Sequence, residues 1–156
     1  MTTESGKQVL SISHVISTDR GDLVMSPLSE PPEGPWSISE SLDTSALPFE
    51  LEVTPLRELP KSLDRDDHVA YLDPEKLQFP LEIRAWKDGD RFRPLGMKGS
   101  KLVSDLLTDL KVPLHEKAYT YVLLSDDEIA WVIGRRISDV FKCTEGQACL
   151  HWRYLP

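Results

Sequence analysis

The chain has 156 residues, of which 40% are hydrophobic and 28% are charged, and its formal net charge is −8. This length allows one ordinary domain or two small ones, and the composition is that of a soluble globular protein. No apolar run approaches the roughly 20 residues that a membrane-spanning helix needs. The first seven residues also lack the basic and apolar parts of a signal peptide. We therefore expect a cytoplasmic protein with no membrane partner.

The two cysteines, Cys143 and Cys149, are too few for a disulfide framework. They also lack the paired C-x-x-C spacing of a zinc site. We expect a reducing cytosol as the compartment and no bound metal.

Charge is distributed unevenly along the chain. Residues 1–80 contain 6 basic and 15 acidic side chains, a net charge of −9, whereas residues 81–156 contain 12 and 11, a net of +1. Within the second half, residues 84–111 hold 7 basic and 4 acidic side chains, a net of +3. The total charge argues against a nucleic-acid partner, but this local excess points to one segment that could bind one.

The first half is predicted to be rich in strands. Apolar residues around 9–16 suggest a strand, and residues 18–22 have the composition of a turn before a second strand at 23–25. Four prolines make 26–35 a loop. Residues 36–39 and 49–53 alternate apolar with polar side chains, as half-buried strands do. A charged, exposed stretch at 62–68 precedes a short buried strand at 69–72, and Asp73-Pro74-Glu75 fits a first helical turn.

The second half combines strands with one helix. Residues 80–86 alternate again, 87–90 form a tight turn, and 96–99 form a glycine-containing loop. Ser100 is a candidate N-cap for a helix whose apolar stripe runs from Leu102 to Leu110 and which Pro113 ends. A hairpin is expected at 119–133, with its turn at 125–128, and a last strand at 148–154. The pattern predicts an α+β fold, a mostly antiparallel β-sandwich with one clear helix.

Catalytic patterns are weak. Asp88 and Asp90 could form a paired-carboxylate site for an independent hydrolase, but they flank a turn glycine, and turn formation explains them. His115-Glu116 lacks the second histidine of a metalloprotease, and the other histidines are scattered. A nucleophile elbow, a phosphate-binding glycine loop and a dinucleotide fingerprint are all missing from the sequence. We therefore expect no catalytic residues in this chain.

The basic segment favours nucleic-acid binding. Arg91 and Arg93 alternate with Phe92, so in an extended chain both guanidinium groups lie on one face. Arginine forks match phosphate oxygens. Lys98 and Lys101 add charge near the expected helix start, where backbone N–H groups around residues 96–100 would attract anions. The same residues also fit a charged surface loop beside a packed helix, and composition does not separate the two interpretations.

At this segment the sequence resembles a known family. Residues 84–105 read R-A-W-K-D-G-D-R-F-R-P-L-G-M-K-G-S-K-L-V-S-D. They match the R-x-W-x-x-G-D-R-F-x-P-x-G-M-x-G pattern, followed by a lysine-led helix, of the C-terminal domain of tRNA(Ile)-lysidine synthetase. The resemblance extends to about residue 143, with one lysine, Lys101, where two often stand. Leu106-Leu107 also replaces the aromatic residues that are frequent in the family.

The resemblance implies a fold similar to a domain of the phenylalanyl-tRNA synthetase β chain, and binding of a tRNA acceptor stem. Enzymes of this family attach lysine to the wobble cytidine of tRNA(Ile) and use ATP, with magnesium, to adenylate the base. Their S-G-G-x-D-S catalytic loop does not occur in this sequence. We therefore expect a C-terminal fragment that is inactive alone, with no cofactor of its own. We divide it into a β-rich acidic linker or subdomain at 1–68 and a tRNA-binding domain at 69–156.

The expected partners are tRNA(Ile) and the catalytic domain of the same protein, and a homodimer is left open. An alternative interpretation is a module that docks on the catalytic domain with little RNA contact, which the acidic first half would favour. Trp86, Phe92 and Trp131 are expected in the core, while Arg84 and the pair Arg135-Arg136 each have acidic neighbours that could neutralise them. The candidate tRNA-binding residues are Arg84, Lys87, Arg91, Arg93, Lys98, Lys101, Lys111, Arg135 and Arg136.

Overall fold

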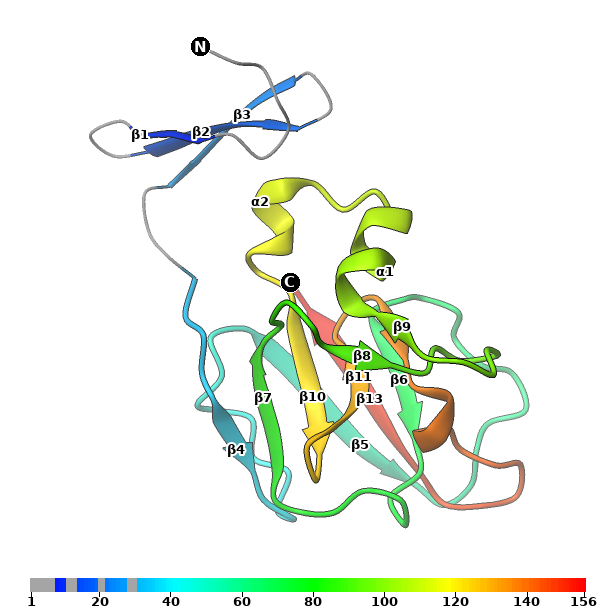
Figure 1. Ribbon diagram of the computed structural model, residues 1–156. Helices are drawn as coiled ribbons and strands as arrows, with labels where there is room; N and C mark the ends of the chain where they lie inside the picture. The colour runs from blue at the N-terminus through cyan, green and yellow to red at the C-terminus, as the bar shows by residue number, and fades with distance from the viewer. Residues whose placement is uncertain (1–7, 11–13, 20–21, 28–30) are drawn as a thin grey trace.

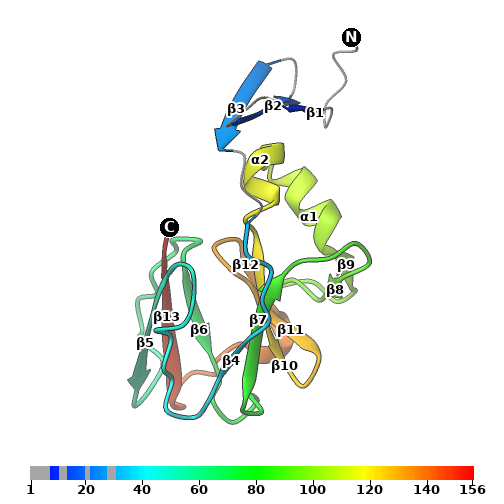
Figure 2. The same ribbon diagram turned by 90° about the vertical axis from the view of Figure 1, so that its left-hand side faces the viewer.

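The computed structural model describes residues 8–10, 14–19, 22–27 and 31–156, with side chains described from residue 31 onward. Two β-sheets pack face to face in this part of the chain, and two short helices lie at one end (Figures 1 and 2). None of the helices found there is long and apolar enough to cross a membrane.

The larger sheet has five antiparallel strands in the order β12-β11-β10-β7-β4. The expected hairpin is confirmed as β10 and β11, and the alternating segment near residue 80 is confirmed as β7. The bounds are β4 Trp36–Ile38, β7 Leu81–Ala85, β10 Tyr121–Ser125, β11 Glu128–Val132 and β12 Arg136–Ile137.

The smaller sheet places the last strand in its centre, in the order β5-β13-β6. β13 (Cys149–Leu155) pairs along its whole length with β5 (Glu50–Leu56) and on its other side with β6 (Val69–Leu72). Both sheets thus combine strands from before and after residue 68, so the expected domain boundary does not coincide with a break in either sheet.

The two sheets enclose an inter-sheet core, which confirms the predicted β-sandwich. Trp131 and Trp152 are completely buried in it, and they pack with side chains from both sheets. Because burial of apolar surface is the main favourable term in folding, these large side chains tie the two sheets together. The buried members are Ile38, Leu51, Ala70, Leu72, Leu77, Leu81, Ile83, Tyr121, Leu123, Ala130, Trp131, Ile133, Phe141, Leu150 and Trp152.

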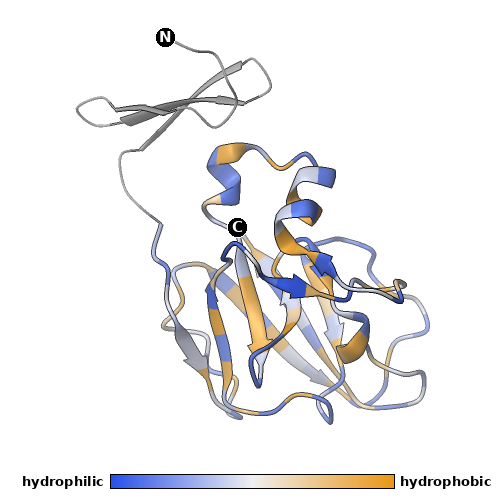
Figure 3. Ribbon diagram, in the orientation of Figure 1, coloured by the Kyte–Doolittle hydropathy of each residue, from blue (hydrophilic) through white to orange (hydrophobic). Residues whose placement is uncertain are grey.

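The five-stranded sheet is buried on its second face as well, under α1 (Val103–Asp109). Side chains of β10 alternate, so that Leu123 enters the inter-sheet core while Val122 and Leu124 enter this helix-side core. Burial on both faces explains why β10 reads as an unbroken apolar run (Figure 3). The helix-side core consists of Phe92, Val103, Leu106, Leu107, Val112, Val122, Leu124, Ile129 and Val132.

One irregularity interrupts the β10–β11 ladder. Leu123 pairs with Trp131 and Leu124 pairs with Ile129, so Ala130 is the extra residue of a β-bulge. The Ala130 carbonyl accepts a hydrogen bond from the Ser138 backbone N–H at 2.8 Å. The bulge therefore anchors the chain that follows β12.

The segment before α1 differs from the prediction. A two-stranded ribbon, β8 (Arg91–Phe92) with β9 (Lys101–Leu102), precedes the helix. The helix N-cap is Leu102 and makes no side-chain capping bond, so the prediction of Ser100 as N-cap was wrong. Ser100 instead accepts a hydrogen bond from Arg91 across the ribbon.

The remaining elements are short. Pro113 is the N-cap of α2 (Leu114–Lys117), and Asp139–Phe141 form a 3-10 turn, η1. Residues 74–76 form a single turn: the Asp73 side chain and carbonyl accept the Glu75 and Lys76 N–H groups, as at a helix start, but no helix continues from it. Near the N-terminus, β1 (Gln8–Leu10), β2 (His14–Asp19) and β3 (Asp22–Pro27) form an antiparallel sheet, and part of the strand expected at 9–16 lies outside the described residues.

Candidate nucleic-acid interface

Arg84 is directed inward by an ion pair. Its two terminal nitrogens donate to the two carboxylate oxygens of Asp90 at 2.9 and 3.0 Å, and the side chains are only 17% and 13% exposed. The Asp90 carboxylate also accepts a hydrogen bond from the Lys87 backbone N–H at 2.8 Å. Arg84, a predicted RNA contact, thus closes the turn after β7.

The Arg84–Asp90 pair also bears on the hydrolase interpretation. Burial works to raise the pKa of Asp90, but the Arg84 and Lys87 hydrogen bonds outweigh it and lower that pKa. The Asp90 hydrogen bond raises the pKa of Arg84 in turn. A carboxylate with both oxygens engaged and a lowered pKa is a poor general base. The geometry therefore favours the turn-forming role of this aspartate.

Arg91 and Arg93 both lie on the exposed side of β8, as the alternation predicts. Phe92 between them is 5% exposed and packs in the helix-side core. Arg91 donates from Nε to the Ser100 hydroxyl at 3.1 Å, and Arg93 donates from Nε to the Met97 carbonyl at 3.0 Å. Each bond engages one edge of its guanidinium group.

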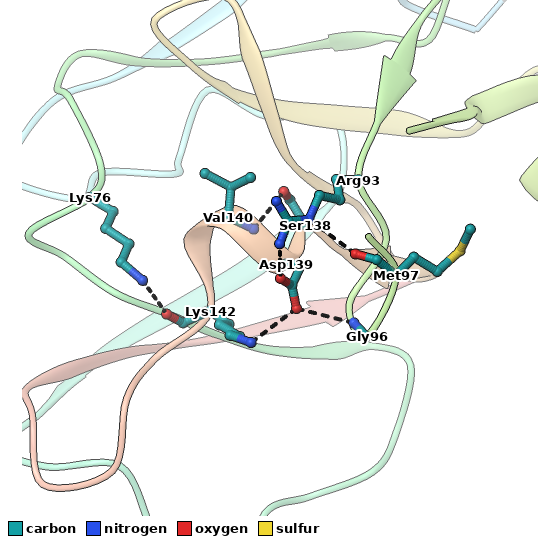
Figure 4. A network of polar contacts seen from close by, with 8 residues as sticks. All are labelled: Lys76, Arg93, Gly96, Met97, Ser138, Asp139, Val140 and Lys142. Atoms are coloured by element: carbon teal, nitrogen blue, oxygen red, sulfur yellow. Dashed lines mark hydrogen bonds and ion pairs between the residues drawn. The ribbon is translucent and has the colours of Figure 1, made fainter. Parts of the chain in front are cut away.

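Asp139 is the centre of a polar network that joins η1 to the loop after β8 (Figure 4). Its carboxylate accepts hydrogen bonds from Arg93 Nη2 at 2.8 Å, the Gly96 N–H at 3.1 Å and Lys142 Nζ at 3.1 Å. Its own N–H donates to the Arg93 carbonyl at 2.8 Å. The Gly96 N–H, followed by Lys142, lowers the pKa of Asp139, so the carboxylate stays charged.

Lys142 is a basic residue at this site that the sequence did not single out. The structure pairs Asp139 with Arg93 and Lys142. Arg93 and Asp139 are far apart in the sequence, and the fold alone brings them together. Lys142 lies within the stretch that resembles the family, which extends to about residue 143, so that resemblance was the signal that could have found it.

The other predicted lysines are spread around this segment. Lys87 and Lys98 are exposed on turns, and Lys111 is exposed with a left-handed backbone angle of φ 57°. Lys101 is paired with Asp109 on α1. Lys98 lies on the loop after Arg93 and Lys101 lies on β9, opposite β8, whereas Lys87 precedes β8 and Lys111 follows α1.

The expected anion site at the helix start does not form. The Val103 N–H, the first of α1, donates to the Asp90 carbonyl at 2.9 Å. The loop at 96–100 is separated from the helix by β9, so its N–H groups do not open the helix. The prediction failed because the ribbon pairs β9 with a strand that lies ten residues earlier in the sequence.

Arg135 and Arg136 lie at a second position. Arg135 is 3.4 Å from Glu116 of α2, an acidic partner that the sequence did not suggest. Both arginines help to line a groove of about 590 Å³, which Leu95 and Lys142 also line. Residues 61–67 add further lining, in which Lys61 and Arg65 accompany Asp64, Asp66 and Asp67.

Comparison with known proteins finds a family match that includes the basic segment at 84–111. Residues 81–154 match the family model described as the TilS substrate C-terminal domain. These residues belong to the TilS C-terminal domain family. This TilS C-terminal domain runs from β7 into β13 and contains the Arg84–Asp90 pair and the Asp139 network.

Full-length relatives extend the match. The chain is 36% identical over 146 residues to a tRNA(Ile)-lysidine synthase of Parabacteroides distasonis, covering 93% of this chain and 33% of the relative. It is 34% identical over 147 residues to that of Bacteroides thetaiotaomicron, covering 91% and 31%, and 40% identical over 106 residues to that of Clostridium tetani, covering 67% and 22%. The chain thus spans about a third or less of these relatives.

A solved structure supports the fold. The chain resembles a crystal structure of a TilS C-terminal domain with a TM-score of 0.61 and 22% sequence identity. The likeness covers 80% of this chain and 92% of the solved one. The α+β sandwich is therefore the fold of a TilS C-terminal domain.

Proposed function

We propose that this chain is the tRNA-binding part of a tRNA(Ile)-lysidine ligase. The relatives that it matches are named tRNA(Ile)-lysidine synthases, and the matched segment holds the local excess of positive charge. The ATP and magnesium of the reaction are proposed to bind outside this chain, in a region of the relatives that it does not span. The part played here is recognition of tRNA(Ile), with the acceptor stem as the segment bound.

The arrangement of Arg91, Arg93, Lys98 and Lys142 carries the proposal. All four side chains are exposed, and three of them lie on or beside the loop that Asp139 holds. Fixed guanidinium and ammonium groups suit the oxygens of a sugar–phosphate backbone. Arg84 is assigned a structural role, because the Asp90 carboxylate already occupies both of its terminal nitrogens.

A second candidate function is docking on the rest of the ligase. Residues 63–67 line the groove with three carboxylates, one arginine and Leu63, which is 45% exposed, and this mixture favours a protein over RNA there. This function would use residues 63–67 of the groove and leave Arg91 and Lys98, which lie outside the groove lining, to RNA. The two candidates therefore predict different surfaces.

A salt titration tests the proposal. Affinity of the chain for tRNA(Ile) and for a minihelix of its acceptor stem would be measured across a range of salt concentrations. Phosphate contacts predict that the logarithm of the binding constant falls linearly with the logarithm of salt concentration, and each lost contact should reduce the slope by about one. Arg91→Ala and Lys98→Ala should each have this effect.

Arg153→Ala is the matched control, because Arg153 is an exposed basic residue of β13, outside the basic segment. It should leave the slope unchanged. Absence of RNA binding at low salt, or equal slopes for Arg91→Ala, Lys98→Ala and the control, would contradict the proposal. Lysidine formation by this chain alone would contradict the location of the chemistry.

A further inference from the structure

Two large apolar side chains stand exposed in the middle of the basic segment. Leu95 is 44% exposed and Met97 is 42% exposed. Exposed apolar side chains are common singly, but two on one tight turn present a compact apolar surface. The turn lies where the chain leaves β8, beside Arg93 and Lys98.

This turn is held rigidly by backbone bonds. The Met97 N–H donates to the Pro94 carbonyl at 2.9 Å, and Gly96 has the positive φ of 84° that the third position of a type II turn requires. The Leu95 N–H donates to the Ile137 carbonyl at 3.1 Å. The Leu95 and Met97 backbones are thus fixed before any partner binds.

The Asp139 side chain also holds the turn. Its carboxylate accepts the Gly96 N–H, and the same carboxylate holds Arg93, whose Nε donates to the Met97 carbonyl (Figure 4). A preorganised contact loses little conformational entropy on binding, so its apolar area counts more fully toward affinity. Asp139 therefore acts as a positioning residue for the turn.

The charges around the turn select the kind of partner. Arg93 and Lys98 flank the turn, and Lys142 donates to the same Asp139 carboxylate as Arg93. The groove that Leu95 lines holds five basic and three acidic side chains, and this positive excess is complementary to a polyanion. An RNA duplex has a wide, shallow groove that displays riboses and base edges between its phosphates. Proteins that bind the DNA minor groove insert apolar side chains at base steps while basic neighbours hold the backbone, and the wide RNA groove is open to apolar contacts of this kind.

We propose that Leu95 and Met97 are RNA contacts, which pack on riboses and base edges in the shallow groove of an A-form duplex. The inference rests on the proposed function and adds contacts that carry no charge. The Asp139 network would then hold the turn that carries both apolar side chains.

Affinity measurements on Leu95→Ala and Met97→Ala test the inference. The ligand is the acceptor-stem minihelix, with a DNA duplex of the same sequence for comparison. Each variant should weaken RNA binding by about 3- to 10-fold at every salt concentration, because a half-exposed side chain has about half its area left to bury. The salt slope should stay the same, since an apolar side chain displaces no counterion. The DNA duplex, whose minor groove is narrower, should lose less affinity.

Tyr119→Ala is the control, because Tyr119 is equally exposed, at 45%, but follows α2 and does not line the groove that Leu95 lines. It should leave RNA affinity unchanged. If Leu95→Ala and Met97→Ala also leave it unchanged while the wild type binds RNA with a steep salt slope, the inference is overturned and the turn belongs to a protein partner. A change of slope in these variants would overturn it as well. Absence of RNA binding by the wild type would instead overturn the proposed function.

Discussion

Arg84 and Arg91 belong to the same basic segment but meet different partners. A carboxylate engages both terminal nitrogens of Arg84, whereas a serine hydroxyl engages only Nε of Arg91. Arg84 is largely buried and Arg91 is exposed. Residue type and sequence position therefore do not distinguish the two arginines. The local hydrogen bonds decide which of them is available to bind a phosphate.

Asp90→Asn should destabilise the protein. The substitution removes the negative charge that the largely buried Arg84 pairs with, and leaving such a partner unsatisfied costs about 1–3 kcal/mol of the free energy of unfolding. Urea denaturation at neutral pH measures the difference. Asp88→Asn is the control, because Asp88 is exposed on the same turn, and it should change the free energy of unfolding by less than about 0.5 kcal/mol.

The effect of Asp90→Asn should depend on pH. The folded state lowers the pKa of Asp90, so the stabilisation is fully present above the ordinary carboxyl pKa and is lost as pH falls through the lowered folded-state value. The gap between wild type and variant should therefore be largest near neutral pH and shrink below about pH 4. A constant gap down to acidic pH would show that the charge of Asp90 does not stabilise the fold.

The turns at Gly96 and Gly134 differ in what surrounds them. Both glycines have positive φ angles, of 84° and 77°. A Cβ on Gly96 would meet open space, whereas a Cβ on Gly134 would lie 2.9 Å from Cδ2 of the Tyr154 ring. Gly96 is thus needed for its backbone angle alone, and Gly134 also for the close approach of β13.

Gly96→Ala and Gly134→Ala should therefore be unequal. Backbone strain alone should lower the free energy of unfolding by about 1–2 kcal/mol for Gly96→Ala. Gly134→Ala should lose about 1–3 kcal/mol more, because the Tyr154 ring must also move. Thermal unfolding of the two variants side by side provides the measurement, and equal losses would mean that Tyr154 yields without cost.

Elements with a strong periodic pattern could be predicted from the sequence, and those set by distant pairing could not. Both strands of the β10–β11 hairpin have apolar runs, and a polar turn joins them, so local signals suffice. The β8–β9 ribbon has no such pattern, since each strand is two residues long and pairs across a loop. Ser100 had the right chemistry for a cap, but that pairing moved the helix start to Val103.

The same distinction applies to the candidate site. The sequence pointed to Arg91, Arg93 and Lys98, because their charges cluster along the chain. Asp139 and Lys142 could not be assigned to them, because β9, both helices and three strands separate these residues from the loop that they hold. RNA contact by the predicted residues stays a prediction.

At the scale of the whole molecule, the two hydrophobic cores share one sheet. β10 and β11 supply side chains to both the inter-sheet core and the helix-side core. Loss of either core would leave one face of these strands exposed to water. The sandwich and α1 should therefore unfold together.

Leu107→Ala tests this coupling. Leu107 is completely buried in the helix-side core, and its truncation should cost about 2–5 kcal/mol. Tryptophan fluorescence reports chiefly on the inter-sheet core, where Trp131 and Trp152 are completely buried. Its midpoint in urea should fall together with the midpoint from circular dichroism. A fluorescence midpoint that stays in place while circular dichroism shifts would mean that α1 unfolds separately.

The bulge at Ala130 gives this hairpin an unusual tolerance for a change in chain length. Deleting Ala130 would restore a regular ladder and keep Trp131 and Ile129 on their present faces. The same deletion would withdraw the carbonyl that holds Ser138, the residue before Asp139. The protein with the shortened hairpin should thus still fold as a sandwich. It should lose the alignment of the loop after Arg93, because Ala130 positions that loop through Ser138 and Asp139.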